Sequence, residues 1–366
     1  MHPILSKILV TSPHSAAERL CVYPLDDLAA FEATGADALT FLQGQITNDI
    51  AGAGPDQARL AGYCTAQGRL LATLVLAQAP TLEDPTRLVG LMRQDVLAPV
   101  LKRLSMYIMR AKAKLTTSSF GVVGVSATTE QAVALSRLLG HSLPSAPWHT
   151  LSTSYGFWIS APSSQGPDVA VAQRWWWLAT PEQSDAIDRF TLPVQILEAR
   201  RWHGQDIASG IPWIEAAIQD LLIPQSVNLD LIEGVSFTKG CYPGQEIVAR
   251  SHYRGTVKRR MHLGQLEHPP AIDLKAGTDI FDRLGSEQAC GRIINVATVA
   301  ATLGARAGHP AQEANNLPEQ TEMSPVISLL FETTFEAVDH DALHAGSRDG
   351  PKILLGKLPY PLKLAS

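Results

Sequence analysis

The first 140 residues alternate short apolar runs with polar turns. Thr34-Gly35-Ala36-Asp37 precedes apolar positions within 38–42, and Gly44 follows them, so we expect a helix here with Thr34 as its cap. Two further helices are predicted over 94–104 and 128–139. Apolar runs bounded by polar turns predict strands between the helices. These runs are 60–64, 70–78, 88–92, 112–116 and 121–125.

The pattern restarts after a stretch rich in Pro and Ser at 142–147. Strands are expected at 155–160 and within 169–180, and Pro181 then opens a helix, as proline does at a first helical position. The three consecutive tryptophans at 175–177 are interpreted as strand or interface packing. Short β and α elements that alternate without long parallel-sheet runs predict an α+β fold of ferredoxin-like, split βαβ units.

Beyond Arg260 the helical periodicity disappears, and β-branched runs separated by turns predict a small β-barrel. These runs are 261–266, 278–281, 291–301 and 326–332. The segment 304–325 is rich in Gly, Ala, Asn, Pro, Gln and Glu, and we interpret it as a flexible hairpin loop without function.

Three parts are therefore expected along the chain. An N-terminal α+β subdomain spans 1–140, and a second α+β subdomain at 141–258 is intertwined with it. The C-terminal barrel spans 259–366. A chain of 366 residues is long enough for each part to bury a core of its own.

The bulk composition excludes several classes of protein. With 45% hydrophobic and 18% charged residues the chain has the composition of an ordinary globular protein. A net charge of −5 argues against an overall nucleic-acid coat or a membrane-surface protein. No apolar run approaches the roughly 20 residues that a membrane span needs. Residues 1–10 show no signal-peptide pattern, so we expect a cytoplasmic protein.

Common catalytic and metal-binding signatures are missing from the sequence. The four cysteines, Cys21, Cys64, Cys241 and Cys290, lie far apart, so neither a disulfide framework nor a zinc site is suggested. None of the eleven histidines pairs with another His or Cys at ligand spacing, and we assign no metal site. There is no P-loop, nucleophile elbow, HExxH or GxGxxG pattern that opens a helix.

The segment around Cys241 is different, because glycine and proline surround a cysteine within a few residues. Gly240, Pro243 and Gly244 predict a tight turn on which the thiol is at least partly accessible. Residues 239–262 carry six cations and one acid, a net +5 in a chain of net −5. Nearby positive charge stabilises a thiolate, which is the nucleophilic and metal-binding form of cysteine. The cations are Lys239, Arg250, Arg254, Lys258, Arg259 and Arg260.

Two other interpretations of this segment stay open. In the first, Cys241 is a small buried apolar residue, and the basic residues form a face that is exposed to solvent. In the second, the basic patch of Arg250, Arg254 and Lys258 contacts phosphate, either of RNA or of a phosphorylated or polyglutamate-bearing ligand. Tyr253 is the single aromatic interleaved with these cations, so the nucleic-acid pattern is sparse.

The motif Lys239-Gly240-Cys241-Tyr242-Pro243-Gly244-Gln245-Glu246 resembles the signature of the YgfZ family, which is related to the aminomethyltransferase (T-protein) of glycine cleavage. Further matches are spread over most of the chain, and 304–325 looks like an insertion among them. They are Gly35–Ala38, Phe41–Asp49, Cys64–Arg69, Gly210–Pro212, Ile223–Gln225, Asn228–Asp230, Phe237, Ala249-Arg250, Arg254-Gly255 and Leu358–Tyr360.

This resemblance implies a T-protein-like fold with three subdomains around a central channel that binds tetrahydrofolate or a derivative. It also implies a role in maintaining iron–sulfur enzymes, including those that methylthiolate tRNA, so the partners would be client enzymes or cluster carriers, with a mostly indirect link to tRNA. The family's important motif cysteine is Cys241 here. A family tryptophan linked to folate matches Trp202, and a second family aromatic falls at Leu28, whose aliphatic side chain covers a pterin face by dispersion alone.

Three functions are compatible with these features. The first is a folate-dependent maturation factor in which Cys241 is a thiolate, Lys239 and Arg254 are its electrostatic neighbours, Tyr242 and Gln245 shape the turn, and Glu246 anchors an arginine. The second is a folate-dependent aminomethyl or methyl transferase; true T-proteins lack the motif but place an acid near the folate, in a region roughly comparable to Asp95. The third is an RNA-binding module that uses the basic segment. We expect the maturation factor.

Overall fold

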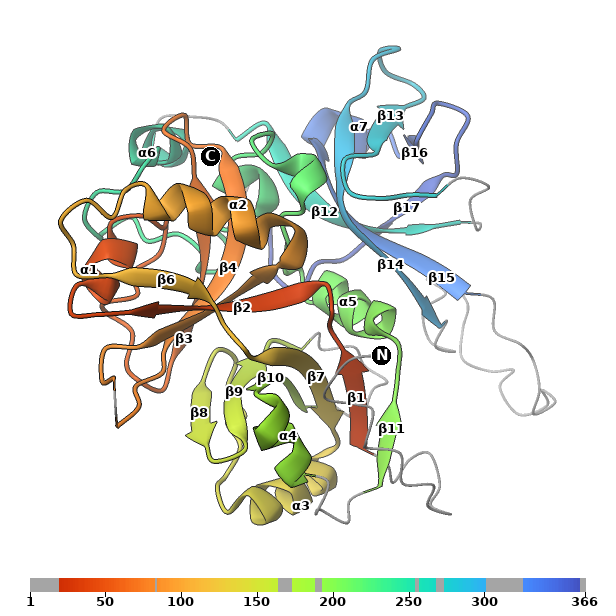
Figure 1. The fold of residues 1–366 in the computed structure, drawn as a ribbon. Coiled ribbons are helices and arrows are strands. Elements are labelled where there is room, and N and C mark those ends of the chain that lie inside the picture. The colour runs from red at the N-terminus through yellow and green to blue at the C-terminus, as the bar shows by residue number, and fades with distance from the viewer. Residues whose placement is uncertain are drawn as a thin grey trace, which may run out of the picture.

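The computed structural model describes residues 20–82, 84–163, 173–187, 193–253, 257–267, 273–300 and 325–362. These residues form three sheets that surround a common centre (Figure 1). The first sheet is antiparallel, with strand order β3-β4-β5-β2-β6. Its strands are β2 (Leu28–Thr34), β3 (Ala58–Cys64), β4 (Leu70–Gln78), β5 (Leu88–Arg93) and β6 (Lys114–Thr117).

Helices α1 (Ala38–Gln43) and α2 (Gln94–Ser105) cover one face of this sheet. Alternation along β4 explains the two layers, because successive side chains of a strand point to opposite faces. Leu74 and Leu76 pack under the helices, whereas Val75 and Ala77 point into the central core. Both faces of the sheet are thus buried.

The second sheet has the order β11-β1-β7-β10-β9-β8. Its strands are β1 (Leu20–Pro24), β7 (Gly121–Ala127), β8 (Thr150–Thr153), β9 (Gly156–Ala161), β10 (Gln173–Ala179) and β11 (Val194–Ile196), and helices α3 (Thr129–Leu139) and α4 (Pro181–Ile187) accompany them. Trp175 and Trp177 pack on the α3 side and Trp176 in the central core, which confirms the packing role predicted for the three tryptophans. Segments from both 1–140 and 141–258 contribute strands to this sheet.

The C-terminal sheet is barrel-like, with order β16-β13-β14-β15-β12-β17. A bridge between His344 and Lys352 brings its two edge strands together and nearly closes it. Its elements are β12 (Arg259–Leu266), β13 (Asp279–Asp282), β14 (Gly291–Ala300), β15 (Pro325–Thr334), α7 (Phe335–Asp339), β16 (Leu343–Ala345) and β17 (Ile353–Gly356).

Helix α5 (Ala199–Ala208) lies where the three sheets meet (Figure 1) and packs against β1, β14 and β15. The central core therefore combines side chains of all three sheets with those of α5, such as Val75, Trp176, Ile294 and Trp202. Helix α6 (Gln245–Tyr253) follows directly after the Cys241 turn.

The predicted elements are largely confirmed, and the following differences have physical reasons. Asp37, not Thr34, stands at the start of α1, and its side chain accepts a hydrogen bond from Lys112 N of a neighbouring loop instead of capping the helix. Helix α6 was not predicted, because it buries Val248 but shows no broad apolar stripe. The short strands β8, β11, β16 and β17 have only three or four residues each, too few for an alternating pattern to stand out.

Residues 1–10 and 301–324, which include nearly all of the expected hairpin loop, lie outside the described residues, and the expected boundaries at 140 and 258 stay predictions. No helix in the described part of the chain is long and apolar enough to cross a membrane.

Candidate functional site

The Cys241 turn, residues 239–244, is anchored by the ammonium group of Lys239. Lys239 Nζ donates hydrogen bonds to three main-chain carbonyls: Gln43 O at 2.5 Å, Ile46 O at 2.7 Å and Asn48 O at 2.9 Å. All three acceptors lie at or just after the C-terminal end of α1, where helix carbonyls lack partners within the helix. An ammonium has three donors, so Lys239 is fully used in this contact. Burial lowers the pKa of Lys239 to about 8, although Asp49 opposes the shift.

The other end of the turn is fixed by two glycines in close contact. Gly244 has a φ of +81°, and a Cβ there would lie 2.5 Å from Thr65 O and 2.6 Å from the Cα of Gly68. Gly68 itself has a φ of +71° and faces Gly244 O. Only glycine combines this conformation with so close an approach. The hairpin turn between β3 and β4 therefore packs directly on the Cys241 turn.

Between these two anchors the thiol of Cys241 is exposed, and it lies outside any helix or strand, as predicted. Its neighbour Tyr242 is buried, and burial raises the pKa of the Tyr242 phenol. Lys239 Nζ lies 5.4 Å from the centre of the Tyr242 ring, within the range of a cation–π contact. Of the four free cysteines, Cys64 is buried and Cys21 and Cys290 are half-buried. Burial raises the pKa of the Cys64 thiol, as expected of an inert cysteine.

Three of the six cations in the predicted basic run, Arg250, Arg259 and Arg260, form ion pairs with carboxylates. Arg260 is buried against Asp230, with Nη1 and Oδ1 2.5 Å apart, and Arg259 lies 3.2 Å from Glu332. Their acids come from distant segments that the local charge count omits. Arg250 pairs with Glu246 at 2.7 Å, which is the anchor expected of that acid. Lys258 is exposed, and Arg254 lies outside the described residues.

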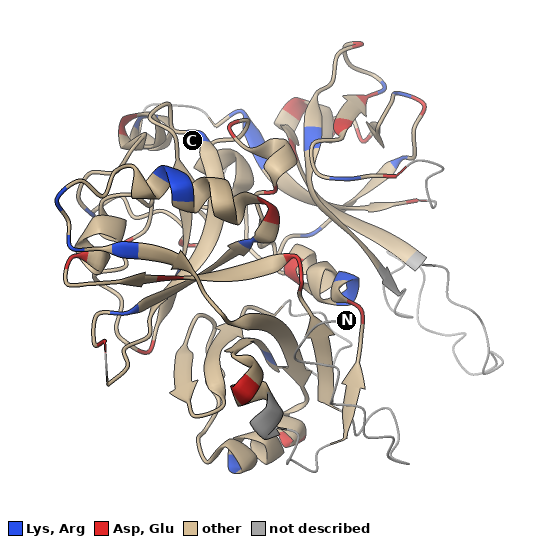
Figure 2. Cartoon of the chain, viewed as in Figure 1, with Lys and Arg blue, Asp and Glu red and all other residues tan. Residues whose placement is uncertain are grey.

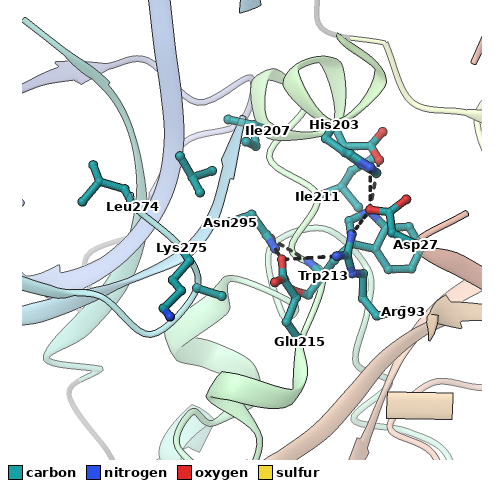
Figure 3. Close-up of a pocket in the computed structure, with 13 residues that line it drawn as sticks. Asp27, Arg93, His203, Ile207, Ile211, Trp213, Glu215, Leu274, Lys275 and Asn295 are labelled. Atoms are coloured by element: carbon teal, nitrogen blue, oxygen red, sulfur yellow. Dashed lines mark hydrogen bonds and ion pairs between the residues drawn. The ribbon is translucent and has the colours of Figure 1, made fainter. Parts of the chain in front are cut away.

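A second candidate site is a cavity of about 180 Å³ at the centre of the molecule, between β2, β5, α5 and the barrel (Figure 3). Polar and apolar side chains line it, and the polar ones are Asp27, Arg93, His203, Asp206, Glu215, Lys275 and Asn295. Arg93 pairs with one oxygen of Asp27, and His203 Nε2 lies 2.7 Å from the same oxygen. Asn295 Nδ2 donates to Glu215 Oε1 at 3.1 Å, and Arg93 Nη2 lies 3.8 Å from that atom.

Two carboxylates of the cavity, those of Asp27 and Glu215, respond to burial in opposite ways. Burial opposes the ionisation of Asp27, but hydrogen bonding and charge from His203 and charge from Arg93 outweigh it and hold the pKa of Asp27 at about 2. For Glu215 burial dominates over the charge of Arg93 and raises the pKa. The cavity therefore contains one carboxylate that stays ionised, Asp27, and one that is protonated more readily, Glu215. Asp27 Oδ1 and Arg93 Nε are both buried without a hydrogen-bond partner among the described residues.

The two residues predicted to contact folate are buried and lie next in sequence to residues that line this cavity. Trp202 is fully buried in α5, where it packs against Tyr23, Trp176 and the guanidinium of Arg174. Leu28 is buried at the start of β2. Neither lines the cavity, but the adjacent residues His203 and Asp27 do.

Sequence reasoning missed every polar residue of the cavity. The sequence offered one indication: Asp27 and His203 are next in sequence to Leu28 and Trp202, the two positions that the family resemblance links to folate. No cluster of three or more metal-ligating side chains is present among the residues that the structure describes.

Comparisons with known proteins agree with this architecture, although no family model matches the chain. The chain is 32% identical over 274 residues to the tRNA-modifying protein YgfZ of Sodalis glossinidius, covering 73% of this chain and 77% of that protein. It is also 32% identical over 283 residues to the tRNA-modifying protein YgfZ of Edwardsiella ictaluri, covering 75% and 79%.

Among solved structures, the fold is similar to the glycine cleavage system aminomethyltransferase T from Bartonella henselae, with a TM-score of 0.63 at 12% identity over 97% of this chain and 89% of that one. The predicted T-protein-like α+β fold is thereby confirmed. From its identity to the two curated relatives, the chain belongs to the YgfZ family.

Proposed function

We propose that this chain is a cytosolic, folate-dependent accessory factor for the assembly or repair of iron–sulfur clusters in client enzymes, including enzymes that modify tRNA. The observation that carries the proposal is the Cys241 turn, where one exposed thiol sits between two anchors. The names of the relatives, tRNA-modifying proteins, support the link to tRNA modification.

Cys241 provides the soft ligand or nucleophile in this proposal, and its neighbours position it. Lys239 and Gly244 hold the two ends of the turn, Tyr242 fills the space beneath it, and Gln245 and Glu246 begin α6. An iron–sulfur cluster needs about four thiolate or imidazole ligands. Because one exposed cysteine supplies one of them, a partner protein must supply the rest.

The polar groups of the central cavity fit the head of a reduced folate. A pterin ring carries an edge with both hydrogen-bond donors and acceptors. The unused oxygen of Asp27 accepts and the unused Nε of Arg93 donates, and the carboxylate of Glu215 adds further acceptor capacity. The volume of about 180 Å³ is below the roughly 300–1,000 Å³ of a pocket that encloses a drug-sized ligand, so only the head group would lie inside. When bound, the folate would supply a carrier for a one-carbon unit.

An aminomethyl or methyl transferase of the T-protein type is the alternative. The T-protein fold and the carboxylates of Asp27 and Glu215 in the cavity favour it. The acid at the position considered for catalysis, Asp95, accepts a hydrogen bond from Ala216 N at 2.8 Å and so also has a structural role. Formation of methylene-tetrahydrofolate from an aminomethylated lipoyl carrier and tetrahydrofolate would establish the transferase and overturn our choice.

Complementation of a strain that lacks its own family member tests the proposal directly. The activity of an iron–sulfur enzyme is measured with the wild type, Cys241→Ala and Cys241→Ser, and Cys290→Ser serves as the matched control on a half-buried thiol. We expect both Cys241 variants to lose most of the restored activity and Cys290→Ser to keep it. Full restoration by both Cys241 variants would refute a role for the thiol.

A further inference from the structure

An exposed apolar loop follows helix α2 on the face of the first sheet that carries α1 (Figure 1). We call residues 102–114, from the last turn of α2 to the first residue of β6, the basic loop. Met106 is 64% exposed, Tyr107 51% and Met109 88%. Three large apolar side chains within four residues form a cluster rather than the scattered exposure that is normal on a protein surface.

Positive charge surrounds these apolar side chains. Residues 96–129 contain five cations and no Asp or Glu, in a chain whose net charge is −5. None of the five forms an ion pair with a carboxylate in the described part of the chain. Figure 2 shows Lys and Arg along this loop and on β6 with no acid of the same segment between them. The exposed cations are Lys102, Arg110, Lys112 and Lys114, and Arg103 lies half-buried beside the hydroxyl of Tyr63.

The basic loop and the Cys241 turn are joined through the two ends of the same short helix. At the start of α1, Asp37 N donates to Lys112 O at 3.1 Å, and Lys112 N donates to Asp37 Oδ2 at 2.7 Å. At its C-terminal end, Gln43 O accepts the hydrogen bond of Lys239. Helix α1 has six residues, a length of about 9 Å at 1.5 Å per residue. The basic loop and the Cys241 turn thus contact opposite ends of one short helix, close enough for one macromolecule to contact both.

We propose that the basic loop is a docking surface for a protein partner whose contact face is an apolar groove rimmed by carboxylates. The inference rests on the proposed function, since the partner is the cluster-bearing protein that Cys241 serves. Met, Tyr and Arg are the residue types enriched in the buried centres of protein interfaces, and Lys belongs to their polar rims. The unbranched, polarisable side chains of Met106 and Met109 adapt to several partner shapes, which suits a factor that serves several clients.

RNA fits the same surface less well. Phosphates would neutralise the cations, and one base would stack on Tyr107. The aliphatic parts of Met106 and Met109 would find no apolar groove on a nucleic acid. An acidic, apolar protein face satisfies both kinds of side chain, so the observations favour a protein.

The test needs an iron–sulfur enzyme whose activity falls in a strain that lacks this chain. The purified enzyme is immobilised, and its affinity for the full-length protein is measured by titration. The variants are M106S/M109S, which removes the apolar contact, and R110E/K112E, which reverses the charge. Val133→Ser and Arg137→Glu on α3 are the matched controls, because Val133 is also exposed, at 47%. We expect each loop variant to weaken binding by about tenfold or more, the controls to stay within about twofold, and the melting temperature to be unchanged.

The outcomes separate this inference from the proposed function. Cys241→Ser should bind the enzyme like the wild type but fail in complementation. The docking surface is refuted if the loop variants bind like the wild type, or if the wild type does not bind. In either case the role of the thiol is decided by complementation alone.

Two further measurements exclude the other occupants. Fluorescence anisotropy with bulk tRNA would favour RNA, and overturn the inference, if R110E/K112E abolished a strongly salt-dependent binding that M106S/M109S left intact. Light scattering that found a dimer of the wild type and a monomer of M106S/M109S would assign the loop to a second copy of this chain instead.

Discussion

The turn that carries Cys241 is held by main-chain groups, whereas the polar wall of the central cavity is held by side-chain charges. Lys239 binds three carbonyls, and Gly244 and Gly68 touch through their backbones. In the cavity, Arg93 and His203 share one carboxylate oxygen of Asp27. The first arrangement fixes the place of an exposed group, and the second leaves buried polar atoms available to a ligand.

This difference separates two kinds of sensitivity. The turn depends on space and backbone conformation, so it should respond to added volume and hardly to acid. The cavity depends on ionisation, so its contribution to stability should change with pH. The contrast would be wrong if substitutions in the turn changed stability mainly through pH, or if substitutions in the cavity changed it mainly through side-chain volume.

The largest effect is expected for Gly244→Ala. The new Cβ would lie 2.5 Å from Thr65 O, and a φ of +81° disfavours any residue with a Cβ. A left-handed conformation costs about 1–2 kcal/mol, and overpacking adds about 1–3 kcal/mol, so we expect a loss of about 2–4 kcal/mol in the free energy of unfolding. Urea denaturation measures it.

Gly240→Ala is the matched control within the same turn, since a Cβ at Gly240 meets nothing within 4 Å. We expect it to change stability by less than about 0.5 kcal/mol. Equal losses in the two variants would show that the contact between the hairpin turn and the Cys241 turn does not hold the site.

A smaller effect is expected for Lys239→Met. The three carbonyls at the end of α1 lose their common donor, and hydrogen bonds to a charged group contribute about 1.5–3 kcal/mol, so we expect a loss of about 2 kcal/mol at pH 7. Lys239→Arg should not rescue it, because a planar guanidinium cannot direct three donors as an ammonium does.

The pH dependence of the same variant provides a second measurement. The pKa of Lys239 is about 8 in the folded protein, below the ordinary value of 10.5. Between these values the unfolded chain binds more protons than the folded one, so the stability of the wild type relative to Lys239→Met should rise as the pH increases from 8 towards 10.5. A difference that falls over this range would contradict the burial of the ammonium.

The smallest stability effect is expected for Asp27→Asn. Its pKa of about 2 lies below the ordinary 3.8, so the stabilisation is present above pH 3.8 and is lost as the pH falls towards 2. The side chain is 34% exposed, and with solvent screening we expect about 1–2 kcal/mol at pH 6 and less at pH 3. Asp349→Asn, at a side chain that is 88% exposed, is the control.

Titration calorimetry with tetrahydrofolate sharpens this prediction. Asp27→Asn should weaken binding by about tenfold, because a charged acceptor becomes a neutral amide. Cys241→Ser should leave the affinity unchanged. Weaker binding by Cys241→Ser, with no effect of Asp27→Asn, would reverse the roles assigned to the two regions.

The sequence was informative about the turn because its determinants are local. Gly240, Cys241 and Gly244 lie within five residues, and glycine and proline reveal a turn without any tertiary knowledge. The partners of Lys239 stayed hidden, because main-chain carbonyls carry no residue identity. Asp230 and Glu332, which neutralise two of the cations, lie too far along the chain for a local charge count to include them.

The cavity was hidden for a related reason: its polar residues come from separate segments, and each is unremarkable alone. Asp27, Arg93, His203, Glu215 and Asn295 converge only when three sheets and α5 assemble. Alternating runs did predict the longer strands, including four strands of the barrel. Strand β2 was missed because its sequence, with three alanines in seven residues, has low strand propensity.

The parallel pairing of β1 with β11 has a consequence for synthesis of the chain on the ribosome. Leu20, Cys21 and Val22 of β1 pair with Val194, Gln195 and Ile196, about 170 residues later. At roughly 5–20 residues per second, the edge of β1 that β11 covers waits on the order of ten to thirty seconds for its partner. During that interval the nascent chain presents an open strand edge, which is the kind of surface that chaperones shield from aggregation.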